Sequence, residues 1–348
     1  MKYEEIMQDI TRQLTGDAQA DLKFLMSKSE EYKTHELANE ILRGIGRMLY
    51  DVIPPEARAE FGRVVGNEQL GVNAVLEEAR FQMYSRNLDR ALEILESLIK
   101  RIEGENGDLL MYRDDSVSEY HNFQDYLEEL LYKDLYKPEK TIRQIPEDYF
   151  RLYFTYGNLL FELKQFEKAR AALKKALKLN PVNTEAIFEL AEIHKLHREW
   201  DEFLLLTKRC LSVAYSRMGI GRCYRNLGYY AIENKEYELA VALYFKSMEY
   251  DRQSTMPQSQ IFYIQQVTGT AIPQLSSYEV NEVLERNNIP TGANNAVLGM
   301  SYGLGRLAVE QGQSELARYF LSILYELTLD KEVEAMIASL PVEKNYPA

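Results

Sequence analysis

The sequence is poor in cysteine, in proline and in long apolar runs. Its two cysteines, Cys210 and Cys223, lie in apolar helical patterns without CxxC spacing, so we expect buried free thiols. With 10 prolines and 18 glycines in 348 residues, wholesale disorder is excluded. No apolar run approaches the roughly 18 residues of a membrane-spanning helix, and the start lacks the basic-then-apolar order of a signal peptide. We therefore expect a cytoplasmic protein that does not bind a membrane.

Basic charge is also scarce. The chain has 41 Lys+Arg against 54 Asp+Glu, for a net charge of −13, which argues against binding to nucleic acid. The imbalance is uneven along the chain. Residues 150–255 carry 17 basic and 13 acidic side chains, for +4, whereas residues 1–149 carry −12 and residues 256–348 carry −5. An acidic partner is therefore expected to dock at the centre of the chain.

No residue grouping typical of an enzyme or a metal site stands out. His194 and His197 have an i, i+3 spacing, but no cysteine accompanies them, so we interpret them as a packed or half-exposed pair. Gly299, Gly303 and Gly305 follow no strand and fall in a helical pattern, which favours close helix packing over a phosphate loop. We predict a protein that is not an enzyme and that holds no cofactor and no metal.

What the sequence does contain is a repeat of about 34 residues. In residues 150–183 two amphipathic stretches are joined by a short polar turn, and Pro181 ends the unit. Ala191 follows Gly157 by 34 residues, and Trp200 follows Phe166 by the same interval. A third copy lies 37 residues further on, a fourth surrounds residue 305 and a weaker one surrounds residue 79. The pattern predicts stacked helical hairpins.

This pattern resembles the tetratricopeptide repeat (TPR), and in particular bacterial cytoplasmic TPR proteins. Small residues stand where the two helices of a hairpin must approach closely, although Phe203 replaces one of them in the second unit. On the first helices these are Gly157, Ala191, Gly228, Gly305 and Ala79, and on the second helices Ala169, Ala240, Ala317 and Ala91. The resemblance implies an all-α fold, a TPR-like α-solenoid in which stacked antiparallel helical hairpins form a right-handed superhelix.

The spacing divides the chain into five segments. They are an N-terminal helical cap region (1–71), divergent TPR-like hairpins with an insertion (72–149), core TPR repeats (150–255), a divergent helical hairpin (256–297), and a C-terminal TPR with a capping helix (298–348). Helices are expected at 119–136, 258–267, 278–287 and 331–340, with a capping box from Ser276 to Glu279 and a helix stop at Pro54-Pro55. No strand pattern is found, and the sequence predicts more than roughly 60% helix, against a base rate near one third.

In the resemblance, the first helices of the hairpins line a concave groove. Carrying its positions over gives a partner-binding groove made of Arg151, Asn158, Arg222, Arg225, Asn226, Tyr229, Tyr302 and Arg306. Arginine makes bidentate hydrogen bonds with carboxylates, so this set predicts an acidic peptide as partner. Glu185, Glu189 and Glu192 lie between these positions and could instead neutralise the arginines internally.

The leading hypothesis is thus a protein–protein interaction scaffold or adaptor that binds a peptide or partner protein in this groove. Asn158, Arg222 and Asn226 match part of the clamp with which some TPR domains hold chaperone tails. Phe154 and Glu189 depart from that clamp, which puts a chaperone-tail receptor in doubt. The alternative is a regulatory or enzymatic protein with a site hidden in the divergent helical regions.

Overall fold

The computed structural model describes residues 3–32, 72–104 and 107–341, together with residues 35, 37, 41, 44, 45, 48 and 52. The chain forms two compact units, residues 1–71 and residues 72–348. The first contains α1 (Tyr3–Arg12) and α2 (Ala18–Glu31), whose buried side chains Ile6, Ile10 and Leu25 share a core with Ile41 and Ile45. The stop expected at Pro54-Pro55 lies outside the described residues.

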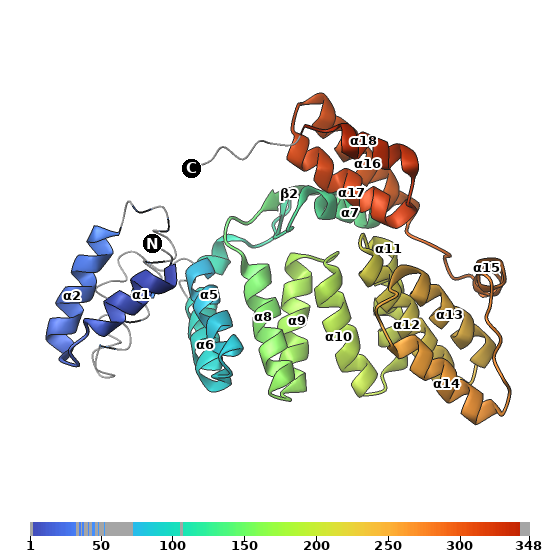
Figure 1. The fold of residues 1–348 in the computed structure, drawn as a ribbon, viewed down its shortest axis with the longest axis horizontal. Coiled ribbons are helices and arrows are strands. Elements are labelled where there is room, and N and C mark those ends of the chain that lie inside the picture. Colours follow the sequence, from blue (N-terminus) through green and yellow to red (C-terminus); the bar gives the residue numbers. More distant parts are fainter. Residues whose placement is uncertain are drawn as a thin grey trace. The chain divides into compact units, whose positions relative to one another are not determined.

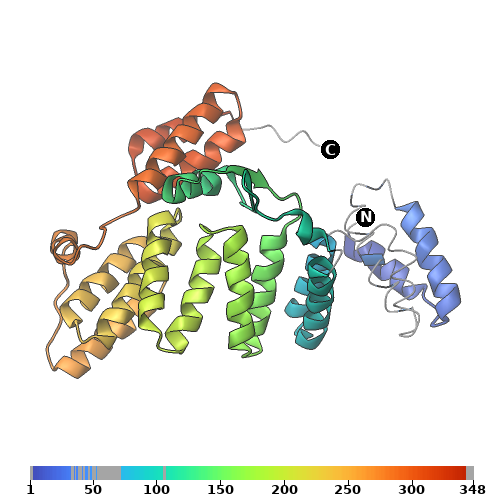
Figure 2. The ribbon, with the colours of Figure 1, turned by 180° about the vertical axis from the view of Figure 1, so that it is seen from behind.

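The second unit contains four consecutive helical hairpins. They are α5 (Val72–Tyr84) with α6 (Leu88–Glu103), α8 (Tyr149–Glu162) with α9 (Phe166–Leu179), α10 (Thr184–Leu196) with α11 (Trp200–Val213), and α12 (Arg217–Glu233) with α13 (Tyr237–Tyr250). The hairpins stand side by side in sequence order (Figures 1 and 2). The structure is 72% helical, which confirms the predicted all-α helical repeat.

The turn inside each hairpin has the same backbone form. Residues Arg86, Lys164, Arg198 and Lys235 all have left-handed backbones, with φ between 57° and 63°. After Lys164, the Gln165 N–H donates to the Leu160 carbonyl (2.8 Å), and the same bond recurs after the other three. This is the hydrogen-bond pattern that closes a helix C-terminus. These positions are separated by the intervals seen in the sequence, so the turns fix the repeat register.

Four further helices follow the fourth hairpin before the chain reaches its last helix, α18. Helices α14 (Met256–Thr268) and α15 (Ser277–Arg286) each pack against α13, and the predicted capping box of Ser276 and Glu279 is confirmed. Helix α16 (Asn295–Glu310) pairs with α17 (Ser314–Thr328), and α18 (Lys331–Ser339) packs against α17.

Glycine brings the helices of three hairpins together. A Cβ on Gly157 would lie 2.8 Å from the Leu173 side chain, and one on Gly305 would lie 2.7 Å from Leu321. A Cβ on Gly228 would lie 3.0 Å from Tyr244 in the same way. The predicted role of these small residues is confirmed. For Gly299 and Gly303 the prediction of close packing is wrong, because a Cβ at either position would meet nothing within 4 Å.

An insertion between α6 and α8 contains a 3-10 turn (Asp108–Met111), strand β1 (Ser118–His121), helix α7 (Tyr126–Tyr136) and strand β2 (Thr141–Gln144). The two strands pair in parallel, with Ser118 opposite Thr141. The helix predicted over 119–136 is therefore wrong in its first turns, and the expected absence of strands is wrong here. Four-residue strands are too short to leave a clear alternation in the sequence.

Asn122 fastens this insertion to the ends of the hairpins. Its backbone N–H donates to the Leu179 carbonyl (2.9 Å), while its carbonyl accepts from the Asn180 amide (3.2 Å). Its side-chain oxygen accepts from the Phe150 N–H (3.1 Å), at the start of α8. Because Asn122 is buried, these bonds satisfy polar groups that water cannot reach. The insertion thereby runs along one end of α8 and α9, as Figure 1 shows.

The α16–α17 hairpin packs against α7 and so lies over the insertion (Figure 2). The Tyr319 hydroxyl donates to the Asp125 carboxylate at the start of α7 (2.8 Å). Arg217, at the start of α12, donates to the Glu326 carbonyl in α17 (2.8 Å). These bonds fix the C-terminal hairpin to two earlier elements. Within the described ranges, no helix is long and apolar enough to cross a membrane.

Candidate partner-binding surface

The first helices of three hairpins, α8, α10 and α12, carry the central residues predicted to face a partner. We call their half-buried and exposed polar and aromatic side chains the first-helix surface. It comprises Arg151, Phe154, Asn158, Glu185, Glu189, Glu192, Arg222 and Tyr229. On α8 and α10 these residues recur at spacings of three or four, and on α12 the two residues are seven apart, which places each set on one face of its helix.

Arg222 joins α12 to α10 at the centre of this surface. Its guanidinium lies 4.4 Å from the centre of the Phe188 ring and 3.4 Å from the Glu189 carboxylate. Its side chain is 35% exposed. Since 3.4 Å is longer than the usual 2.7–3.2 Å of an N–H···O bond, the Glu189 contact is weak. The guanidinium has five donors, so this contact leaves Arg222 able to bind a further acceptor.

Arg225 is one turn further along α12 and has a different environment. It donates to the Asp251 carboxylate just after α13 (2.8 Å), and the two side chains are 12% and 15% exposed. Arg225 therefore holds α12 to the end of α13, and Asn226 is buried beside it.

On α8, the N-terminal turn is also tied to its surroundings. Arg151 donates to the Gln124 side chain of the insertion (2.7 Å) and lies 3.9 Å from Asp148. Asn158, two turns later, is half-buried, and its side-chain oxygen is a buried acceptor without a hydrogen-bond partner in the described part of the chain. Its amide thus has bonding capacity that the fold does not use.

Tyr229 is the last residue of the first-helix surface on α12. The Lys195 ammonium lies 5.4 Å from the centre of its ring, and the Trp200 ring is 6.1 Å away. Burial raises the pKa of the Tyr229 hydroxyl, so it stays protonated and can donate at neutral pH. Lys195 is itself paired with Glu192 (2.6 Å). An aromatic side chain and an ion pair therefore flank this end of the surface.

The other two predicted residues, Tyr302 and Arg306, belong to α16. Arg306 donates to the Tyr302 hydroxyl (3.3 Å) and lies 3.5 Å from Glu310. Because α16 packs against α17 and α7, these two residues lie on the C-terminal hairpin, apart from the set on α8, α10 and α12. The structure therefore places six of the eight predicted residues on α8 and α12 and the other two on another hairpin.

His194, His197, Cys210 and Cys223 contact other parts of the fold or are buried in it. His194 is buried and bonded through Nδ1 to Glu199, whereas His197 is exposed and its Nδ1 contacts the Ile193 carbonyl (2.9 Å). Cys210 and Cys223 are buried free thiols, as predicted, and burial raises the pKa of Cys210. Among the residues that the structure describes, no group of three or more His, Cys, Asp or Glu side chains gathers as a metal site would require.

A buried carboxylate at the joint with the insertion was not found from the sequence. Glu128 on α7 accepts hydrogen bonds from the Gln124 N–H (2.7 Å) and from the side-chain amides of Asn180 (2.7 Å) and Asn183 (3.1 Å). Burial raises its pKa above the ordinary value for a glutamate. Its three donors come from two segments more than 50 residues apart, so no local pattern marks it.

A comparison with protein families agrees with the repeat. Residues 150–181 match the tetratricopeptide repeat family. A comparison with curated proteins gave no match. Among solved structures, the crystal structure of YrrB, described as a TPR protein with an unusual peptide-binding site, matches at 17% identity and a TM-score of 0.30. That match covers 54% of this chain and 91% of YrrB. Residues 150–181, which form the α8–α9 hairpin, are thus a tetratricopeptide repeat.

Proposed function

We propose that this protein is an interaction scaffold and that its first-helix surface binds an extended segment of a partner protein. Tetratricopeptide repeats are protein-interaction modules, and the resemblance gives their first helices the binding role. The observation that carries the proposal is Arg222. Its guanidinium is partly exposed, rests on Phe188 and has only a long contact with Glu189, so most of its donors are unused.

An acidic group is the partner chemistry that best fits Arg222. A carboxylate could approach it in the bidentate geometry that Glu189 does not reach, and such charge-assisted bonds are short and strong. Asn158 adds a half-buried amide, and Phe154 and Tyr229 add aromatic contact area. Glu185 is exposed on α10, so the segment also needs a polar or basic residue near that position. We therefore propose a partner segment with one carboxylate flanked by polar or basic side chains.

Arg222→Ala is the variant that tests this function. Proteins captured by the wild-type chain are identified by mass spectrometry, and the bound segment is then titrated as a labelled peptide. We expect Arg222→Ala to weaken binding by about 1.5–2 kcal/mol, as removal of a central arginine commonly does. Arg113→Ala is the control, since Arg113 is exposed and has no ion pair or hydrogen bond in the described ranges.

A change of the peptide tests the chemistry separately. Replacing its carboxylate residue by the corresponding amide should lower affinity for the wild type but not for Arg222→Ala. Equal affinity of wild type and Arg222→Ala, with both proteins folded, would remove Arg222 and this surface from the binding site.

A further inference from the structure

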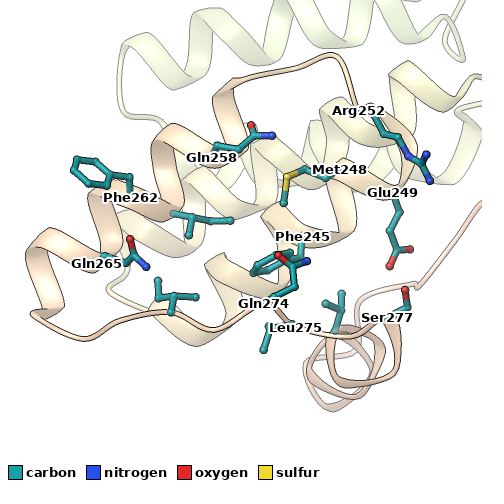
Figure 3. A pocket seen from close by; sticks show the side chains of 13 residues that line it. Phe245, Met248, Glu249, Arg252, Gln258, Phe262, Gln265, Gln274, Leu275 and Ser277 are labelled. Carbon is teal, nitrogen blue, oxygen red and sulfur yellow. The ribbon is translucent and has the colours of Figure 1, made fainter.

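A cavity of about 610 Å³ lies between α13, α14, α15 and the connection at residues 269–276 (Figure 3). Its origin is the divergent hairpin. In the regular hairpins a glycine or alanine lets the two helices touch, but neither α14 nor α15 contains either residue. Both helices pack against α13 instead, and an eight-residue connection spans the distance between them. The space that close helix packing would have filled stays open.

Seven of the thirteen side chains that line this cavity are apolar, and the other six are polar or charged. Phe245, Met248, Ile261, Ile272, Leu275 and Val280 provide the apolar lining. Phe262 also lines it and is 60% exposed, so an aromatic ring stands at the rim facing solvent. The volume lies within the roughly 300–1,000 Å³ typical of pockets that hold small ligands. Such a cavity suits an apolar group that enters from solvent.

The charges at one end of the cavity sum to one positive charge. Glu249 accepts a hydrogen bond from the Lys246 ammonium (2.7 Å), and Lys246 is buried and also donates to Asn281 (2.9 Å). Arg252 lines the same end, is exposed, and makes no ion pair or hydrogen bond within the described residues. Since Lys246 neutralises Glu249, Arg252 remains as an unpaired guanidinium beside an apolar cavity (Figure 3). A carboxylate is its natural partner.

Primary amides complete the rim. Gln265 and Gln274 line the cavity from α14 and from the connection, and neither side-chain amide makes a hydrogen bond in the described part of the chain. A side-chain amide has both a donor and an acceptor, which is the combination that a peptide backbone presents. The rim therefore matches a peptide better than it matches a simple fatty acid, which has no amide groups.

We propose that this cavity binds the C-terminal residue of a partner protein. The apolar side chain of that residue enters the cavity, its terminal carboxylate pairs with Arg252, and the preceding peptide groups bond to Gln265 and Gln274. A C-terminal residue supplies the apolar group and the carboxylate within one residue, as the cavity requires. This site is separate from the first-helix surface and does not depend on it.

The test uses the full-length protein with isotope-labelled isoleucine and methionine methyl groups. The probe is the peptide acetyl-Gly-Ser-Gly-Leu with a free carboxylate, titrated to millimolar concentration. We expect saturating shifts of the Ile261, Ile272 and Met248 methyl signals. The same peptide with an amidated C-terminus should bind about tenfold more weakly, because it lacks the charge that Arg252 recognises.

Two variants test whether Arg252 is the residue that distinguishes the free peptide from the amidated peptide. In Arg252→Gln the free and amidated peptides should bind equally, whereas Arg113→Gln should behave as wild type. The proposal is overturned if the methyl signals do not move, or if the two peptides bind the wild type equally. It is also overturned if octanoate binds the cavity more tightly than the free peptide, because the site would then be one for fatty acids.

Discussion

The Arg225 guanidinium donates to the Asp251 carboxylate across 2.8 Å, and each side chain is no more than 15% exposed. The neighbouring pair of Arg222 and Glu189 is longer, at 3.4 Å, and more exposed, at 35% and 28%. Two arginines one turn apart on α12 therefore have different roles. The Arg225–Asp251 pair holds two helices together, whereas the Arg222–Glu189 pair leaves the arginine partly exposed.

Alanine substitutions separate these roles. Arg225→Ala should lower the free energy of unfolding by about 2 kcal/mol, because it leaves the Asp251 carboxylate partly buried and unpaired. Arg222→Ala should lower it by less than about 1 kcal/mol, since its ion pair is long and partly screened by water. Urea denaturation followed by circular dichroism measures both. A larger loss for Arg222→Ala than for Arg225→Ala would contradict the assignment.

Glycine positions that look alike in the sequence should respond in opposite ways to alanine. Gly157→Ala places a methyl group 2.8 Å from the buried Leu173 side chain, so we expect a loss of about 1–3 kcal/mol from overpacking. Gly303→Ala meets nothing within 4 Å and removes a glycine from a helix, so we expect a gain of about 0.5–1 kcal/mol. Thermal unfolding of the two variants beside the wild type tests this. A loss of stability in Gly303→Ala would show that this part of α16 is covered.

Glycine substitutions in the hairpin turns should stabilise the protein. Lys164, Arg198 and Lys235 have φ values of 57–61°, a region that costs an L-residue about 1 kcal/mol relative to glycine. Each change to glycine should raise the unfolding free energy by about 0.5–1 kcal/mol. Lys174→Gly, in the exposed middle of α9, is the matched control and should lower it by a similar amount. Destabilisation by all four changes would mean that these turns carry no strain.

Glu128 should make stability depend on pH. Burial raises its pKa in the folded state, so the folded protein binds this proton more tightly than the unfolded chain does. The ionised form therefore costs stability above the folded pKa, and that cost disappears as pH falls below the unfolded value. Relative to Glu128→Gln, which cannot ionise, the wild type should gain stability between pH 7.5 and 4.5. Denaturant unfolding at both pH values tests the sign, and a relative loss at pH 4.5 would contradict it.

The repeats and their register could be predicted from the sequence because they depend on local residue size. A glycine at 157 or 305 permits a helix contact that a larger residue would block, and the intervals between such positions recur in the turns at Lys164 and Arg198. The fold class follows from these local requirements. Gly303 shows that residue size alone is not sufficient. A glycine permits close helix packing, but at this position no other helix lies within contact distance.

Features that join distant segments could not be predicted in this way. The partner of Arg225 lies 26 residues away in another turn, and two donors to Glu128, Asn180 and Asn183, lie more than 50 residues away between α9 and α10. The cavity beside Arg252 arises because α14 and α15 lack small residues, and the sequence pattern only marked this hairpin as divergent. Each of these features depends on which helices contact one another in the folded chain. The periodicity of the sequence shows only which face of each helix is apolar.

The bond between Tyr319 and Asp125 joins residues 194 positions apart in the chain. In an open array of repeats each unit touches only its neighbours, so the ends fray first and folding spreads from any point. Here the last hairpin is held by the insertion and by Arg217, so it cannot detach without breaking contacts to early parts of the second unit. That unit should therefore unfold in a single cooperative step. It should also fold more slowly than an open array of equal length, because the chain must first close these long loops.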